Sequence, residues 1–131
     1  MAGDRLLLDT VYIQALLNNR DSYHQQALLL FPTVRDAAEV WVTEAVLVEV
    51  ANALSAINHS IAAQFIRQCY QTSNMHVVSV GTSLLNEAVE LYRARPDKTW
   101  SLTDCISFIV MSQQEIVDAV TADKHFSQAG Y

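Results

Sequence analysis

The sequence predicts an α/β fold, a three-layer α/β/α sandwich around a central parallel sheet. Short apolar segments alternate along the chain with longer segments of helical periodicity, as in folds where helices connect parallel strands. Strands this short and apolar, separated by long helices, imply a sheet with helices on both faces. The chain has 131 residues, of which 51% are hydrophobic. Residues 1–131 are therefore expected to form one domain with a substantial core.

Four segments are predicted to be the strands of this sheet. Each is a short apolar run, and Gly81 closes the third one. The predicted strands are residues 5–9, 40–43, 76–80 and 117–121.

Six helical segments are predicted between and beside the strands. Asn58 separates the middle pair, and Ser101 begins a cluster of capping residues before the last helix. Pro96 ends the fifth helix at Arg95, because the residue before a proline is disfavoured in the α region. The predicted helices are residues 10–18, 22–35, 43–57, 60–71, 83–95 and 103–114.

The chain shows no pattern of a signal peptide or a membrane span. Its start lacks a basic region, and Asp9 interrupts the only early apolar run. No uncharged apolar stretch approaches about 20 residues. Cys69 and Cys105 form no metal-ligand or disulfide pattern. We therefore expect a cytoplasmic protein with two free thiols and no membrane contact.

Four carboxylates stand where an apolar run stops or where an apolar helix has no evident need for a charge. Charged side chains are rarely buried unless they are paired or bind a metal. The chain has 8 Lys and Arg against 14 Asp and Glu, so cations are too few to pair every acid. The sequence therefore predicts one divalent-metal site formed by Asp9, Glu49, Asp104 and Asp123.

The predicted sheet brings these acids to one edge. In open parallel sheets, ligands bind beyond the carboxyl ends of the strands, where the strand order reverses. If the first and fourth strands are neighbours, with the second and third beyond the first, the crevice falls between Asp9 and Asp123. Glu49 follows the second strand and Asp104 begins the helix before the fourth, so both are expected at the same edge.

Each acid taken alone also has a structural interpretation. Asp9, Asp104 and Asp123 each precede a helical segment, where an aspartate often accepts backbone hydrogen bonds as an N-cap. Glu44, in the first helical turn, is expected to interact with the helix dipole and is a weaker alternative to Glu49.

Glu49 has the weakest structural interpretation of the four. It shares a predicted helix face with apolar residues, so its charge requires a partner. Asn52, one turn further, is a candidate hydrogen-bonding partner for it. The apolar residues of this face are Val46, Val50, Ala53 and Ile57.

Four stretches of the chain carry recognisable motifs. They are Leu-Asp-Thr at 8–10, Thr-Glu-Ala-Val-Leu-Val-Glu-Val-Ala-Asn-Ala-Leu at 43–54, Leu-Thr-Asp-Cys-Ile-Ser at 102–107 and Thr-Ala-Asp-Lys-His-Phe-Ser-Gln-Ala-Gly at 121–130. In this order and spacing they resemble the motifs of PIN domains, most closely those of VapC-type toxins from bacterial toxin and antitoxin pairs. The resemblance implies a PIN-like endoribonuclease that cleaves RNA with one or two Mg²⁺ or Mn²⁺ ions, and an antitoxin protein as partner. It assigns the catalytic and metal-binding roles to Asp9, Glu49, Asp104 and Asp123.

The chain departs from the family pattern at two places. His125 stands where many relatives carry a further acid, and the sequence stops at Tyr131, before an edge strand that relatives often have. The predicted sheet therefore has four strands, or five if a partner supplies the last one.

The implied chemistry requires carboxylates for a physical reason. Mg²⁺ prefers oxygen ligands and keeps several waters, and two ions about 4 Å apart can support an in-line displacement at phosphorus. We assign Asp9 and Asp104 to the ion nearest the nucleophile and Glu49 to a water or a second ion. Asp123 then coordinates directly or through water.

The net charge of −6 argues against a protein that coats nucleic acid by charge alone. It does not exclude an enzyme that acts on nucleic acid. Without the four acids the balance is −2, so bound cations can attract phosphate locally.

Other polar residues lie near the acids in the sequence. Thr10 and Thr121 are candidates to hydrogen-bond the site acids, with turn and cap roles as the alternative. Residues 93–100 combine cations with an aromatic residue, as expected either of a solvated loop or of a segment that holds single-stranded RNA by charge and stacking. The candidate RNA contacts are Arg93, Arg95, Lys98, Trp100, Lys124 and His125.

Other functional classes fit less well. A receiver domain needs an aspartate at the end of the third strand, where Ser79-Val80-Gly81 stands, and a haloacid-dehalogenase-like phosphatase needs one at Val11. Three glycines provide neither a nucleophile elbow nor a phosphate loop. The serious alternative is a non-catalytic PIN-like module that binds protein or RNA.

The helices between residues 21 and 71 hold more apolar surface than one small sheet can cover. A homodimer or an antitoxin complex is therefore expected. Their large aromatic residues are Tyr23, Phe31, Phe65 and Tyr70.

Overall fold

The computed structural model describes residues 3–121 and contains four strands and six helices in the predicted order. The bounds differ from the predicted ones by at most three residues. The elements are β1 (Arg5–Leu8), α1 (Thr10–Leu17), α2 (His24–Arg35), β2 (Glu39–Thr43), α3 (Glu44–Leu54), α4 (His59–Gln71), β3 (Met75–Val78), α5 (Thr82–Ala94), α6 (Leu102–Gln114) and β4 (Asp118–Val120).

The four strands form one parallel sheet in the order β3-β2-β1-β4. Leu6 of β1 is in register with Val40 of β2 on one side and with Asp118 of β4 on the other. The first and fourth strands are therefore neighbours, with the second and third beyond the first, which is the condition stated for the predicted crevice. The strand order reverses beside β1, so the crevice expected for a ligand lies beyond the carboxyl ends of β1 and β4.

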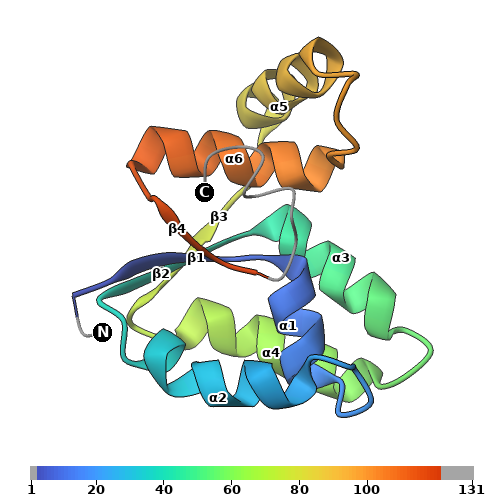
Figure 1. The fold of residues 1–131 in the computed structure, drawn as a ribbon, viewed down its shortest axis with the longest axis vertical. Helices are drawn as coiled ribbons and strands as arrows, with labels where there is room; N and C mark the ends of the chain where they lie inside the picture. The colour runs from blue at the N-terminus through green and yellow to red at the C-terminus, as the bar shows by residue number, and fades with distance from the viewer. Residues whose placement is uncertain (1–2, 122–131) are drawn as a thin grey trace.

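Helices cover both faces of the sheet, which confirms the three-layer sandwich (Figure 1). Successive side chains of a strand point to opposite faces. Leu6 and Leu8 accordingly belong to the core beneath α1, α2, α3 and α4, whereas Leu7 belongs to the core beneath α6. Figure 1 shows α5 stacked on α6, on the side of α6 away from α2 and α4.

Capping residues determine where the two central helices begin. Thr43 ends β2, and its Oγ1 accepts a hydrogen bond from the Val46 N–H at 3.2 Å, so α3 starts directly after the strand. The side chain of Asn58 accepts from the Ile61 N–H at 3.0 Å and starts α4. A turn between the two helices ends α3 at Leu54, three residues before its predicted end.

None of the helices within residues 3–121 is long and apolar enough to cross a membrane. Cys69 and Cys105 are free and buried, each in a different core of the sandwich.

The cap of α3 can be tested by comparing two variants of the fully buried Thr43. Thr43→Ser and Thr43→Ala both lose the methyl group, but only serine keeps the hydroxyl that caps α3. We expect the free energy of unfolding of Thr43→Ala to be roughly 1 kcal/mol below that of Thr43→Ser. Chemical denaturation measures the difference, and equal stability of the two variants would show that the cap contributes nothing.

Candidate active site

Asp9 follows β1 and occupies the N-cap position of α1, but its side chain makes no capping hydrogen bond to that helix. The residue is 3% exposed. Its Oδ2 accepts a hydrogen bond from the Thr121 hydroxyl at 2.6 Å, and its backbone N–H donates to the Val120 carbonyl at 3.3 Å. Because the Asp9 side chain does not cap α1, the capping interpretation of Asp9 does not hold in this structure. Charged side chains are rarely buried, so the position of this carboxylate needs another explanation.

Asp104 lies in the first turn of α6 and forms a capping box with Ser101. The Ser101 N–H donates to Asp104 Oδ2 at 3.0 Å, and the Asp104 N–H donates to Ser101 Oγ at 3.0 Å. The helix begins one residue before the predicted start, with Ser101 as its N-cap. Asp104 is 8% exposed. An ionised carboxylate has about four lone-pair sites, so one hydrogen bond to a backbone N–H is compatible with metal binding.

Glu49 lies in the second turn of α3 and is half-buried. It lines a hollow of about 490 Å³ together with Asn52 of the same helix, Val80 and Leu85 near the start of α5, and Thr103 beside Asp104. Glu49 and the first turn of α6 therefore border the same space. The structure places no hydrogen bond between the Asn52 and Glu49 side chains, both of which lie in the described part of the chain.

The predicted environment of Glu49 was partly wrong. Val46 and Val50 are buried as expected, but Ala53 is exposed and Ile57 is 57% exposed. Ile57 lies outside the helix, because α3 ends at Leu54. Glu49 is consequently at the border of the buried face, where water can solvate its charge. The buried face of α3 consists of Val46, Leu47, Val50 and Leu54.

Glu44, the weaker alternative, has two hydrogen-bonding partners of its own. The Tyr70 hydroxyl donates to Glu44 Oε2 at 2.6 Å, and the Val80 N–H donates to Oε1 at 3.3 Å. The hydrogen bond to the Glu44 carboxylate, with a smaller effect of burial, raises the pKa of Tyr70 to about 12. Glu44 therefore connects α3 to α4 and to the end of β3, a link that the sequence analysis missed.

Two further hydroxyl groups beside the acids are buried without a hydrogen-bonding partner in residues 3–121. They are Thr10 Oγ1, next to Asp9, and Ser107 Oγ, three residues after Asp104 on α6. Buried hydroxyls normally have partners, so these two mark positions where a ligand or water can be bound. The sequence analysis had selected Thr10 but not Ser107.

The starts of α1, α3 and α6 lie around the carboxyl ends of β1, β2 and β4 (Figure 1). Within the described residues, however, no three acidic, His or Cys side chains are close enough to hold a metal ion. Asp123, the fourth predicted acid, lies outside the described residues, as do Lys124 and His125. The three described candidates, Asp9, Asp104 and Glu49, are therefore not brought together as one set of metal ligands, and Thr121 bonds to Asp9.

The stretch 93–100 differs from its predicted role at Trp100. This side chain is 7% exposed, with its ring edge-to-face against Phe108 at 5.0 Å between centroids. The Arg95 guanidinium lies 5.2 Å from the ring centroid. A base has no open ring face on which to stack, so the stacking role predicted for Trp100 is not supported.

The PIN domain family model matches residues 6–130. The chain belongs to the PIN domain family. Among solved structures, it is similar to Mycobacterium tuberculosis VapC20, described as a "Sarcin-Ricin loop cleaving toxin", with 26% identity and a TM-score of 0.86 over 96% of this chain and 95% of that one. The resemblance to VapC-type toxins that the motifs implied is therefore confirmed.

The fold is also shared with FitAcB from Neisseria gonorrhoeae, at 11% identity and a TM-score of 0.64 over 95% of this chain and 92% of that one. This second likeness shows the fold alone. A comparison with curated proteins gives no match.

The two roles of Asp104 can be separated by substitution. Asp104→Asn keeps an acceptor for the Ser101 N–H, so we expect the free energy of unfolding to change by less than about 1 kcal/mol. If Asp104 is a metal ligand, the loss of its charge should lower nuclease activity by roughly two orders of magnitude or more. Asp104→Ala, which loses both functions, should be inactive and also less stable. Full activity of Asp104→Asn would remove this residue from the site.

Proposed function

We propose that this PIN-family protein is a divalent-metal-dependent endoribonuclease that acts in the cytoplasm and is inhibited by an antitoxin. The proposal is supported by two buried carboxylates, Asp9 directly after β1 beside the switch point of the sheet and Asp104 in the first turn of α6. Asp9 makes no cap, and the desolvation of both groups opposes folding unless a favourable interaction offsets it.

The residues present fit Mg²⁺ or Mn²⁺ rather than a softer metal. The described site offers carboxylate and hydroxyl oxygens, which hard divalent cations prefer, and no thiolate or imidazole. Asp9 and Asp104 would hold an ion, with Glu49 holding a water or a second ion and Asp123 completing the set. The unpartnered hydroxyls of Thr10 and Ser107 can accept or donate hydrogen bonds to waters of such an ion.

A bound ion would supply charge stabilisation at the phosphate and a more acidic water for attack. The chain's own residues position the reactants. Thr121 fixes the orientation of the Asp9 carboxylate, and the capping box fixes that of Asp104. Glu49 borders an open hollow, so its carboxylate can orient a water and accept its proton.

VapC20 suggests which RNA to test first. That toxin is described as cleaving the sarcin-ricin loop, and it covers almost the whole of this chain. We propose a structured RNA loop of this kind as the substrate class, since PIN-family recognition by a small acidic domain must depend on RNA shape as well as charge.

The alternative is a non-catalytic PIN-like module that binds protein or RNA through its surface. Asp9 and Asp104 each accept a hydrogen bond, but a neutral side chain could accept it as well. A binding module of this kind does not need two buried carboxylates, whose burial costs stability. The arrangement therefore favours an enzyme.

Metal dependence is the direct test of the proposed activity. Purified protein should cleave an RNA that contains the sarcin-ricin loop in Mg²⁺ or Mn²⁺ and lose this activity in excess EDTA. Restoration by added Mg²⁺ and absence of cleavage by Asp9→Asn exclude a contaminating nuclease. Undiminished cleavage in EDTA would contradict the proposal.

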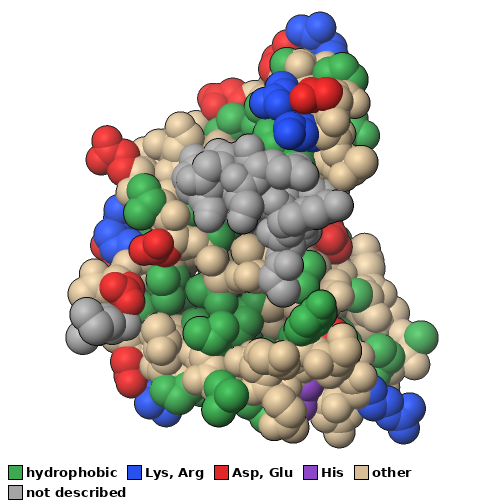
Figure 2. Space-filling model, viewed as in Figure 1, with side chains coloured by type: hydrophobic (Ala, Val, Ile, Leu, Met, Phe, Trp, Pro, Cys, Tyr) green, Lys and Arg blue, Asp and Glu red, His purple; other side chains and the backbone are tan. Residues whose placement is uncertain are grey.

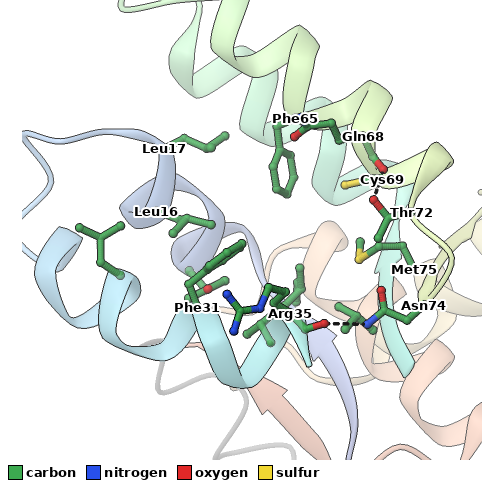
Figure 3. A pocket seen from close by; sticks show the side chains of 15 residues that line it. Leu16, Leu17, Phe31, Arg35, Phe65, Gln68, Cys69, Thr72, Asn74 and Met75 are labelled. Atoms are coloured by element: carbon green, nitrogen blue, oxygen red, sulfur yellow. Dashed lines mark hydrogen bonds between the residues drawn. The ribbon is translucent and has the colours of Figure 1, made fainter. Parts of the chain in front are cut away.

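An apolar groove of about 390 Å³ between α1, α2 and α4 is our proposed antitoxin site. Figure 3 shows the rings of Phe31 from α2 and Phe65 from α4 on opposite sides of the groove, with Leu16 and Leu17 of α1 beside them. Phe31 is 41% exposed, and Leu28, which also lines the groove, is 45% exposed. Such apolar surface on one helix is typical of a protein-binding face, and a groove between helices fits a narrow segment of a partner.

A second apolar surface is our proposed homodimer contact. It comprises Val48 on α3 with Leu85, Val89 and Tyr92 on α5, all of them exposed. Val48 and Leu85 also line the hollow of Glu49, so a second copy seated here would border the active site. In a twofold dimer, the same patch of each subunit contacts its copy in the other subunit. An open surface can form such a contact more easily than a groove can.

The two surfaces serve as controls for each other. Phe31→Glu in the groove should abolish co-purification with the antitoxin, which is to be sought in the neighbouring genes, while light scattering still gives the mass of a dimer. Val89→Glu on α5 should give a monomer that still co-purifies with that partner. If Phe31→Glu gives a monomer and Val89→Glu loses the partner, the two assignments are exchanged. If the wild-type protein is a monomer at high micromolar concentration, there is no homodimer.

A further inference from the structure

We propose that the hollow formed by the α5–α6 connection binds the phosphodiester backbone of single-stranded RNA and leads it to the acids of the active site. The proposal rests on the proposed function, because it takes RNA as the substrate. It replaces the stacking role expected for Trp100 with a different one, in which cations contact phosphates and the aromatic ring only supports them.

The hollow has a volume of about 480 Å³ and combines three cations with hydrogen-bonding groups. It is lined by Tyr92, Arg93, Arg95, Pro96, Lys98, Thr99 and Trp100. These three cations are three of the 8 Lys and Arg in the whole chain. Ser101, directly after the hollow, is the N-cap of α6 and bonds to Asp104, so the hollow adjoins the active-site helix.

Trp100 explains why Arg95, one of these cations, has a defined position. Its ring is buried against Phe108, and the Arg95 guanidinium lies over it at 5.2 Å. A cation above an aromatic face is attracted by the ring, and the contact restricts the long arginine side chain. The backbone turn is also closed, because the Lys98 N–H donates to the Arg95 carbonyl at 3.1 Å. Arg95 is therefore held at the hollow before RNA arrives.

Two of the cations have carboxylate partners that phosphate can replace. Arg95 binds Asp97 through Nε and Nη2 at 3.0 and 2.9 Å, and Arg93 binds Glu90 at 2.7 Å. Exposed ion pairs of this kind contribute little to stability, so a phosphate can compete for either guanidinium, and for Arg95 in the same bidentate geometry. Lys98 makes no salt bridge within residues 3–121, so its ammonium is available to a phosphate.

The other cations of the described chain lie elsewhere. Arg5 binds Glu39 and the carbonyl of Gln114 at the end of α6, which is the opposite end from Asp104. Arg35 pairs with Asp36 after α2. Figure 2 shows Lys and Arg side chains gathered over α5 and the connection to α6, with acidic side chains among them. A polyanion that approaches Asp104 therefore meets this cluster, whose charge is modest and local.

The test measures RNA binding in excess EDTA, so that it does not depend on catalysis. The anisotropy of a short labelled single-stranded RNA gives its affinity for the full chain at several salt concentrations. Lys98→Gln should weaken binding several-fold and lower the slope of log affinity against log salt by roughly 0.7, the value for one phosphate contact on a single strand. Asp97→Asn should have the opposite effect, because it frees Arg95 for phosphate.

Matched controls remove the same charges elsewhere. Arg67→Gln on α4 removes a cation, and Asp36→Asn removes the partner of another exposed arginine. Neither should change RNA affinity measurably. If Lys98→Gln behaves like Arg67→Gln, or if Asp97→Asn binds no tighter than Asp36→Asn, the hollow is not an RNA site.

The two proposals fail in different ways. A protein that never cleaves RNA in Mg²⁺, but shows the opposite shifts of Lys98→Gln and Asp97→Asn, retains the RNA site and overturns the catalytic function. A protein that cleaves RNA normally in all four variants, with unchanged KM and unchanged affinity, overturns this inference alone. If both proposals hold, Lys98→Gln raises KM and leaves kcat nearly unchanged, because Lys98 contacts the strand away from the reacting phosphate.

Discussion

The contact between the ends of β1 and β4 is the constraint on which the site depends. These strands are separated by most of the chain, and β4 has only three residues, Asp118–Val120. The hydrogen bond from the Thr121 hydroxyl to Asp9 and the bond from the Asp9 N–H to Val120 extend their pairing beyond the last strand residue. The same interactions therefore define the register of the edge strand and the orientation of the Asp9 carboxylate.

Asp104 shows how a structural motif can also position a functional group. Its capping box satisfies two N–H groups at the start of α6 and at the same time restricts the rotation of its own carboxylate. Glu49 is held differently, on the border of a helix whose opposite face is buried through Val50 and Leu54. The orientations of Asp9 and Asp104 are restricted, as proposed metal ligands require. Glu49 is more accessible to solvent, as a group proposed to orient and deprotonate water requires.

The sequence predicted the elements, because apolar runs and caps are local. The strand order was only a condition for the predicted crevice, and the structure supplies it. The sequence analysis misjudged features that depend on distant residues. The predicted apolar face around Glu49 included Ile57. Ile57 lies outside the helix, because α3 ends at Leu54. The exposure of Trp100 depends on Phe108 of the next helix, and the partner of Glu44 is Tyr70 on another helix. Neither contact has a signal in the local sequence.

The distribution of charge reconciles a net charge of −6 with a nucleic-acid substrate. A protein that coats RNA needs many phosphate contacts, and its affinity then falls steeply with salt. Here the described cations nearest the acids belong to one connection, where Arg95 and Lys98 lie beside the start of α6. Few phosphate contacts give weak binding to arbitrary RNA, so the charge distribution fits the proposed selective activity better than general RNA binding. In the proposed mechanism, the protein selects its RNA by shape. The RNA must present one strand to the hollow of the α5–α6 connection and, at the same time, its scissile bond to Asp9 and Asp104.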